Sequence, residues 1–155
     1  MIVTGSFADL NNDYNEIYIL NRDLSLFNKH VVVNDTSYIN HCLDLCPSKE
    51  LNDYILDLSK NNNFTEKVYF SEIVPTYLSE IKKSKNAKKQ LNILYNKAKK
   101  QNILLFCYCE NEPYCIRSVV AGLLYGAGVN IYSTQYGNII KNEYFKYYNL
   151  YESLD

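Results

Sequence analysis

The sequence has few of the features that mark membrane or secreted proteins. No apolar run approaches the roughly 20 residues of a membrane-spanning helix. The opening MIVTGSFADL lacks the basic flank and long apolar segment of a signal peptide. The five cysteines are odd in number and unevenly spaced, so we expect thiols rather than a disulfide framework. Together these absences favour a soluble cytoplasmic protein.

The sequence also has no excess of charge of one sign. Sixteen lysines and arginines stand against 17 aspartates and glutamates, which gives a formal net charge of -1. Strong non-specific binding to duplex nucleic acid needs a basic surplus, so neither nucleic acid nor a membrane is an expected partner. A Walker loop and a G-x-G-x-x-G motif are both missing, which argues against a standard ATP or dinucleotide site.

The apolar pattern alternates between the two kinds of secondary structure. It predicts strands over residues 1–7, 16–20, 30–34, 102–108 and 128–134. It predicts helices over residues 37–45, 47–60, 64–81, 85–100, 117–128 and 142–154, with Ser48 as a helix cap and Pro75 as a kink. Strands that alternate with helices indicate an α/β protein. We therefore expect one compact, Rossmann-like domain over residues 1–155, with a mainly parallel sheet and helices on both faces.

The stretch LLFCYCENEPYCIRSVVAGLL, residues 104–124, is the strongest candidate for a functional site. It joins an expected buried strand to an expected helix, and α/β sheets bind ligands beyond the carboxyl ends of their strands. Arg117 and the unpaired N–H groups of the helix start suit a phosphate or carboxylate, while an ion pair of Arg117 with Glu110 or Glu112 is the alternative. The expected ligand-binding residues are Thr4, Gly5, Ser6, Phe7, Tyr69, Cys107, Tyr108, Tyr114, Arg117 and Ser118.

Three interpretations of the cysteines in this stretch remain open. They are small core residues, or Cys109 or Cys115 is a catalytic thiolate activated by Arg117 and the helix start, or they bind zinc. In the zinc interpretation, His41, Cys42 or Cys46 completes the ligand set, but the C-x-C-x5-C spacing differs from paired C-x2-C knuckles. We therefore expect neither a metal nor a cofactor. His30, at the start of a strand, and His41, on a helix, are expected to be structural.

These motifs resemble those of the domain-of-unknown-function 488 family (DUF488). Its signature reads as an apolar strand, Cys-Tyr, a short loop and Cys-His-Arg before a helix. MIVTGSFADL, LCPSKELNDYI and FTEKVYFSEIV are similar to its opening strand, its Pro-Ser helix start and its tyrosine-bearing helix. The resemblance implies a compact α/β domain with a polar cluster made of Thr4, Ser6, Cys107, Cys115 and Arg117. It brings no settled activity with it.

This sequence departs from the family signature at one position, since Ile116 stands where the family has histidine. An acid–base role for that histidine is absent, and binding without turnover is the expectation. We expect a small-molecule binding domain for a nucleotide or another phosphorylated or anionic ligand, which includes sequestering a signalling nucleotide. One alternative is a cysteine-dependent transferase or hydrolase acting on a nucleotide-like substrate. Another is a protein-interaction module using the aromatic C-terminal tail, and assembly into a homo-oligomer is left open.

Overall fold

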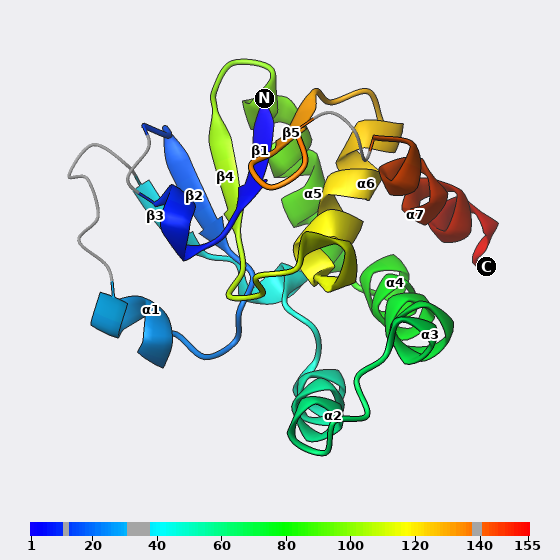
Figure 1. Ribbon diagram of the computed structural model, residues 1–155. Helices are drawn as coiled ribbons and strands as arrows, with labels where there is room; N and C mark the ends of the chain where they lie inside the picture. Colours follow the sequence, from blue (N-terminus) through cyan, green and yellow to red (C-terminus); the bar gives the residue numbers. More distant parts are fainter. Residues whose placement is uncertain (11–12, 31–37, 138–140) are drawn as a thin grey trace.

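In the part of the chain that the computed structural model describes, the core is a five-stranded sheet whose strands pair in parallel (Figure 1). The structure describes residues 1–10, 13–30, 38–137 and 141–155. The strands are β1 (Ile2–Gly5), β2 (Glu16–Ile19), β3 (Tyr38–His41), β4 (Ile103–Phe106) and β5 (Ile131–Ser133), in the order β3-β2-β4-β1-β5. The expected α/β class and parallel sheet are confirmed.

β4 lies at the centre of the sheet, between β1 and β2. All four of its residues are fully buried, as the continuous apolar run Ile103–Phe106 predicts for a strand covered on both faces. Ile103 and Leu105 belong to one hydrophobic cluster and Leu104 and Phe106 to a second. The two clusters lie on opposite faces because successive side chains of a strand point in opposite directions.

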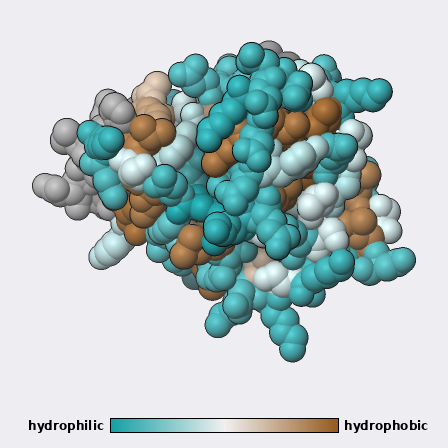
Figure 2. All heavy atoms as spheres, turned by 90° about the horizontal axis from the view of Figure 1, so that it is seen from below, coloured by the Kyte–Doolittle hydropathy of each residue, from teal (hydrophilic) through white to brown (hydrophobic). Residues whose placement is uncertain are grey.

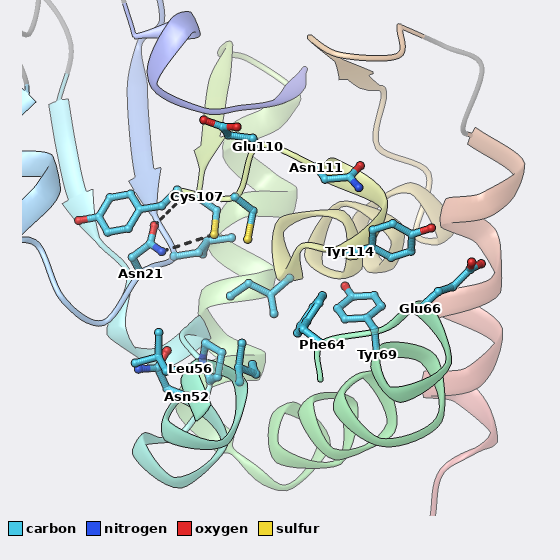
Figure 3. A pocket seen from close by; sticks show the side chains of 16 residues that line it. Asn21, Asn52, Leu56, Phe64, Glu66, Tyr69, Cys107, Glu110, Asn111 and Tyr114 are labelled. Atoms are coloured by element: carbon cyan, nitrogen blue, oxygen red, sulfur yellow. Dashed lines mark hydrogen bonds between the residues drawn. The ribbon is translucent and has the colours of Figure 1, made fainter. Parts of the chain in front are cut away.

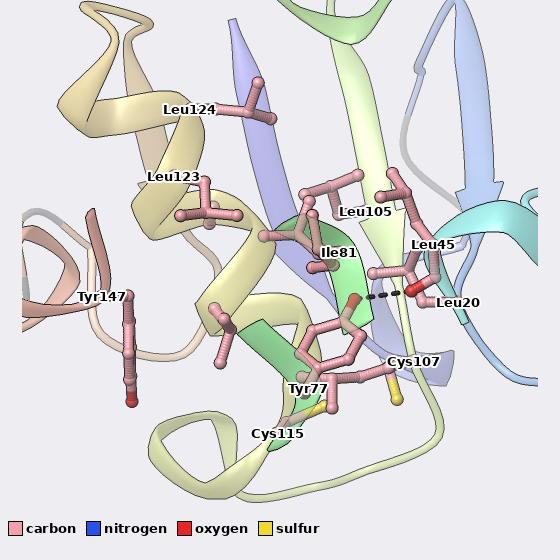
Figure 4. Packing of buried hydrophobic residues seen from close by; sticks show 14 of the residues in the cluster. Leu20, Leu45, Tyr77, Ile81, Leu105, Cys107, Cys115, Leu123, Leu124 and Tyr147 are labelled. Atoms are coloured by element: carbon pink, nitrogen blue, oxygen red, sulfur yellow. Dashed lines mark hydrogen bonds between the residues drawn. The ribbon is translucent and has the colours of Figure 1, made fainter. Parts of the chain in front are cut away.

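The larger cluster packs the sheet against most of the helical structure. It contains residues of α2 (Lys49–Lys60), α4 (Val74–Lys83), α5 (Lys85–Ala98), α6 (Ile116–Gly126) and α7 (Lys141–Ser153). Figure 4 shows its centre, where the Tyr77 hydroxyl donates a hydrogen bond of 2.5 Å to the carbonyl oxygen of Leu45. The smaller cluster is covered by α1 (Ser25–His30) and the chain that follows β1, through Phe27 and Leu10. Helices therefore cover both faces, but unequally.

Several helix boundaries follow from local chemistry. Ser48 caps α2 by accepting a hydrogen bond of 3.1 Å from the N–H of Leu51, as predicted. The expected helix over 64–81 is divided into α3 (Glu66–Val68), a π-helical turn (Tyr69–Ile73) and α4. The π-helical turn ends just before Pro75, which has no N–H to donate to a regular helical ladder. After α6, Gly128 has φ +103, a conformation that favours glycine.

Two predictions around residues 30–45 are wrong, and a third lies outside the described residues. Residues 38–41 form the edge strand β3, followed by a short 3-10 turn (Leu43–Leu45), where a helix was expected. His41 is therefore on a strand, and His30 is the last residue of α1 and does not open a strand. The rest of the strand expected over 30–34 falls on residues that the structure does not describe. Residues 38–41 are extended because they pair in parallel with β2, and no local sequence pattern predicts that pairing.

The connections that follow β4 and β1 leave toward opposite faces of the sheet. The connection from β4 to β5 runs through α6, whose residues belong to the larger cluster. The connection from the neighbouring β1 to β2 passes Leu10 and Tyr14 in the smaller cluster. In α/β sheets, the carboxyl ends of strands connected in this way are the usual position of ligand sites. Among the described residues no helix is both long and apolar enough to span a bilayer.

Candidate functional site

A pocket of about 740 Å³ lies beside the carboxyl end of β4 (Figure 3). One wall comes from α2 and the chain after it, with Asn52, Leu56 and Phe64. The opposite wall is the loop between β4 and α6, from Cys107 to Tyr114. Clefts of this size are ordinary for small-molecule sites. Figure 2, which views the molecule from this side, shows hydrophilic side chains with separate apolar patches between them.

Three cysteines lie together at the loop between β4 and α6, and two of them, Cys107 and Cys109, line the pocket. Cys107 and Cys109 follow β4, and Cys115 is the residue that precedes α6. Their sulfur atoms all lie within 4.8 Å of one another. Cys107 and Cys115 are buried, whereas Cys109 is exposed. The structure therefore places one accessible thiol against two inaccessible ones.

Arg117 holds the backbone around these sulfurs in place. Its Nη1 donates to the carbonyl oxygens of Cys109, at 2.6 Å, and Cys107, at 3.3 Å. The same nitrogen lies 3.5 Å from the sulfur of Cys115. On the other side, the side-chain amide of Asn21 accepts from the N–H of Tyr108 at 3.0 Å and donates to the sulfur of Cys107 at 3.5 Å. The loop is fixed by side chains from α6 and from the end of β2.

Arg117 is only 2% exposed and forms an ion pair with Glu112, which is fully buried. The Arg117 Nε and Glu112 Oε1 atoms are 3.9 Å apart. The carboxylate also accepts hydrogen bonds from the Ser133 hydroxyl and, at 3.0 Å, from the Tyr144 hydroxyl. Of the two alternatives for Arg117, the structure thus shows the intramolecular pair, with Glu112 and not Glu110. The guanidinium lies behind the cysteines and is not among the residues that line the pocket.

The three thiols have different acidities because they share protons. The pKa of Cys107 lies well below its ordinary value, because the thiols of Cys109 and Cys115 donate to its sulfur and Arg117 adds positive charge. Donation to Cys107 raises the pKa of Cys109 to about 12. Burial raises the pKa of Cys115 well above its ordinary value. These directions make Cys107 the most acidic of the three thiols, whereas the sequence points to Cys109 or Cys115 as the reactive one.

The residues expected from the first strand lie beside β4 but contact other groups. Thr4 is fully buried, and its hydroxyl lies close to that of Tyr144. The N–H of Ser6 donates to Asp9 at 2.9 Å, and a Cβ on Gly5 would meet the same carboxylate at 2.6 Å. Phe7 stacks on Tyr108 with ring centroids 5.3 Å apart. None of these four lines the pocket.

Of the other expected residues, Tyr69, Tyr108, Tyr114 and Cys107 do line the pocket. The rings of Tyr69 and Tyr114 meet edge to face at 5.9 Å (Figure 3). Ser118 is buried in α6, where its hydroxyl donates to the carbonyl oxygen of Cys115 at 2.7 Å. The structure thus brings together the aromatic and cysteine residues, and it places the first-strand residues and Ser118 behind them.

Sequence reasoning missed Asn21, Asn52 and Phe64, which also line the pocket. Asn21 follows β2 closely, and a polar side chain just after a parallel strand was a usable signal. Asn52 and Phe64 lie on or after α2, and no local pattern connects them to β4.

The model of a known family, described as "Active DUF488-N3 subclade", matches residues 25–128. The chain belongs to the DUF488 family. The matched region includes the three cysteines and Arg117, while Thr4 and Ser6 lie before it. Ile116, where the resemblance to the family implies a histidine, lines the pocket. Neither a search of curated proteins nor a search of solved structures gives a match.

Proposed function

We propose that this chain is a small-molecule binding domain that holds the base and sugar of a nucleoside or nucleotide in the pocket beside β4. The observation that carries the proposal is the combination, in one pocket of about 740 Å³, of aromatic rings with polar side chains that have no partner in the described protein. Planar heterocycles with hydrogen-bonding edges fit such a pocket. Flexible apolar ligands would leave its polar groups unpaired.

The aromatic part of the pocket consists of Phe64, Tyr69, Tyr108 and Tyr114. Aromatic side chains stack on nucleobases without needing a charge, and each stacked base contributes about 1–3 kcal/mol. The hydroxyl of Tyr69 is buried beside the side chains of Ser118 and Tyr147. Tyr69 therefore offers the ligand its ring and not its hydroxyl.

The polar part of the pocket is made of amides and carboxylates. Asn52, Asn111 and Glu110 line it, and the structure gives their side chains no hydrogen bond to another described residue. Asparagine matches a donor–acceptor edge such as that of adenine, and glutamate accepts from an exocyclic amine. These three residues are the groups that we expect to select the base.

The charge of the pocket argues that the phosphate is not the main anchor. The described lining residues include the carboxylates of Glu66 and Glu110 but no lysine or arginine. Arg117 is buried and paired with Glu112, so it does not offer the anion clamp expected from the sequence. Arg22 donates from Nη1 to the carbonyl oxygen of Pro47, a lining residue, at 3.0 Å. A phosphate attached to the ligand would have to extend toward Arg22.

Calorimetric titration of the full chain with matched nucleobases, nucleosides and nucleoside monophosphates tests this proposal. We expect at least one base series to bind, and Tyr114→Ala to weaken that binding by roughly 5- to 150-fold, the effect of one lost stacking partner. Tyr132→Ala is the control, because Tyr132 is exposed on β5 and does not line the pocket. Absence of binding across the panel, or equal affinities for wild type and Tyr114→Ala, overturns the proposal.

One observation favours a second function, cysteine-dependent transfer or hydrolysis on the same ligand. The exposed Cys109 lines the pocket, so this residue borders the space that the ligand would occupy. The description of the matching family as an active subclade agrees with chemistry at this site. Product formation from a bound nucleoside that is lost in Cys109→Ser would support the enzyme, whereas binding without turnover would support the binding domain alone.

A further inference from the structure

The arrangement of Cys107, Cys109 and Cys115 matches a metal site better than a group of ordinary core thiols. Zinc binds thiolates at about 2.3 Å, which places the sulfurs of a tetrahedral site about 3.8 Å apart. Here all three sulfurs already lie within 4.8 Å. Cys109 is exposed, so its side chain has room to close the remaining gap. We propose that these three cysteines bind a thiophilic divalent cation of the Zn²⁺ class.

The surroundings of the three sulfurs suit a charged centre. Three thiolates and a divalent cation carry a net charge of -1, and the guanidinium of Arg117 lies 3.5 Å from the sulfur of Cys115. Because Arg117 also binds the carbonyl oxygens of Cys107 and Cys109, it orients the ligand-bearing backbone. Partners of this kind, one layer outside the ligands, raise metal affinity. Figure 4 shows the sulfurs of Cys107 and Cys115 at the end of the core nearest the β4–α6 loop.

The other two cysteines provide an internal comparison. Cys42 and Cys46 are also buried, but the thiol of Cys46 donates to the carbonyl oxygen of Cys42 at 3.3 Å. Among the described residues, neither joins the sulfur cluster, and nor does His41, whose Nε2 lies 2.6 Å from the carbonyl oxygen of Asn21. His41, Cys42 and Cys46, which the sequence offered as a fourth zinc ligand, therefore lie outside the cluster of three sulfurs.

Three protein ligands leave one coordination position open. Structural zinc sites usually have four protein ligands, whereas catalytic sites have three together with a water or substrate atom. Cys107 and Cys109 both line the pocket, so the open position faces the same space as the proposed nucleoside. The metal site does not depend on that ligand, and it can be measured in its absence.

Cobalt titration of the full-length, reduced and chelator-treated protein tests the site. Co²⁺ bound by thiolates gives an intense charge-transfer absorption, and Zn²⁺ should displace the cobalt and remove it. We expect one equivalent per chain. Cys109→Ser should weaken binding by more than about 100-fold, since loss of even an outer-shell partner reduces affinity by roughly 10- to 100-fold. Cys109 is exposed, so this variant should keep the fold, which circular dichroism verifies.

Cys46→Ser is the matched control, because it removes a buried thiol outside the cluster. It should bind cobalt with the affinity of the wild type. A wild type without charge-transfer absorption, a Cys109→Ser variant that binds as tightly as the wild type, or an equal loss in Cys46→Ser each overturns the inference. Because no nucleoside is present, these results are independent of those that test the binding of the organic ligand.

Discussion

Arg117 donates a hydrogen bond of 2.6 Å from Nη1 to the carbonyl oxygen of Cys109, which joins a buried charge to the exposed thiol of the pocket. The guanidinium is paired on its other side with Glu112, and that carboxylate binds Ser133 and Tyr144. A chain of polar contacts thus runs from β5 and α7 to the wall of the pocket. We infer that Arg117 positions the site and does not bind the ligand itself.

Arg117→Met should destabilise the protein, because it leaves the carboxylate of Glu112 buried without its cation. Breaking a buried pair in this way costs about 3–5 kcal/mol in the free energy of unfolding. For a chain of this size the loss corresponds to a fall of roughly 10 °C in Tm. Urea and thermal unfolding measure it, and the double variant with Glu112→Gln should recover part of the loss. If the losses in the free energy of unfolding of the two single variants simply add in the double variant, Arg117 and Glu112 are not coupled.

The buried thiols of Cys42 and Cys46 should make stability depend on alkaline pH. Burial raises the pKa of Cys42 to about 11 and that of Cys46 to about 12. A raised thiol pKa means that above the ordinary value, about 8.5, the unfolded chain has lost a proton that the folded chain keeps. The free energy of unfolding should therefore fall between about pH 9 and pH 11, by about 1.4 kcal/mol per pH unit for each thiol.

Cys46→Ser tests this dependence, since it removes one of the two titrating groups. Chemical unfolding at a series of pH values should show a shallower decline for the variant, by about 1.4 kcal/mol per pH unit. Parallel pH profiles for the variant and the wild type would show that Cys46 ionises equally in the folded and unfolded states.

Gly122→Ala should loosen the contact between α6 and α7. A Cβ at this position would lie 2.5 Å from the carbonyl oxygen of Tyr144 and 2.9 Å from the ring of Tyr147. Inserting a methyl group into a packed interface of this kind destabilises by about 1–3 kcal/mol. Hydrogen exchange should become faster in α7 with little change in β4. Unchanged hydrogen exchange in α7 would mean that the contact between α6 and α7 accommodates the added methyl group without loss of stability.

Cys109 should be the thiol that reacts in the native protein. It is exposed, whereas Cys42, Cys46, Cys107 and Cys115 are each at most 7% exposed. Alkylation of the metal-free protein followed by peptide mass spectrometry should find Cys109 labelled first and the others labelled only after denaturation. Because the pKa of Cys109 is raised to about 12, its labelling should be slow near neutral pH and become faster as the pH rises. Cys109→Ser is the control and should show no native labelling, and Zn²⁺ should protect the wild type. Equal labelling of all five thiols would contradict the described burial.

The elements that were predicted correctly from sequence are those with strong local patterns. The apolar run Ile103–Phe106 is fully buried, and the capping serine of α2 lies where its sequence predicts. The edge strand Tyr38–His41 has no such pattern, because its first two residues are exposed and its conformation depends on pairing with β2. Polar residues before it and Pro47 after it also resemble helix boundaries.

The structure has a pocket at the loop that the sequence singles out, but the residues around it are arranged differently from the expectation. The cysteines of this loop and Arg117 are adjacent in sequence, and parallel sheets place such loops at a common edge. Whether Arg117 faces the ligand or the core depends on Glu112, Ser133 and Tyr144, and the last two come from later elements. Asn21 and Asn52 likewise reach the pocket from distant segments. Only the assembled fold shows these relationships.

Mass spectrometry of small molecules released from the purified, native protein tests whether the pocket beside β4 holds a nucleobase. We expect a compound with a nucleobase-like ring that copurifies with the wild type and with Tyr132→Ala, and that is strongly depleted in Tyr114→Ala. Recovery of the same compound in equal amounts from all three proteins, or of no such compound together with no binding of added nucleosides, would contradict it.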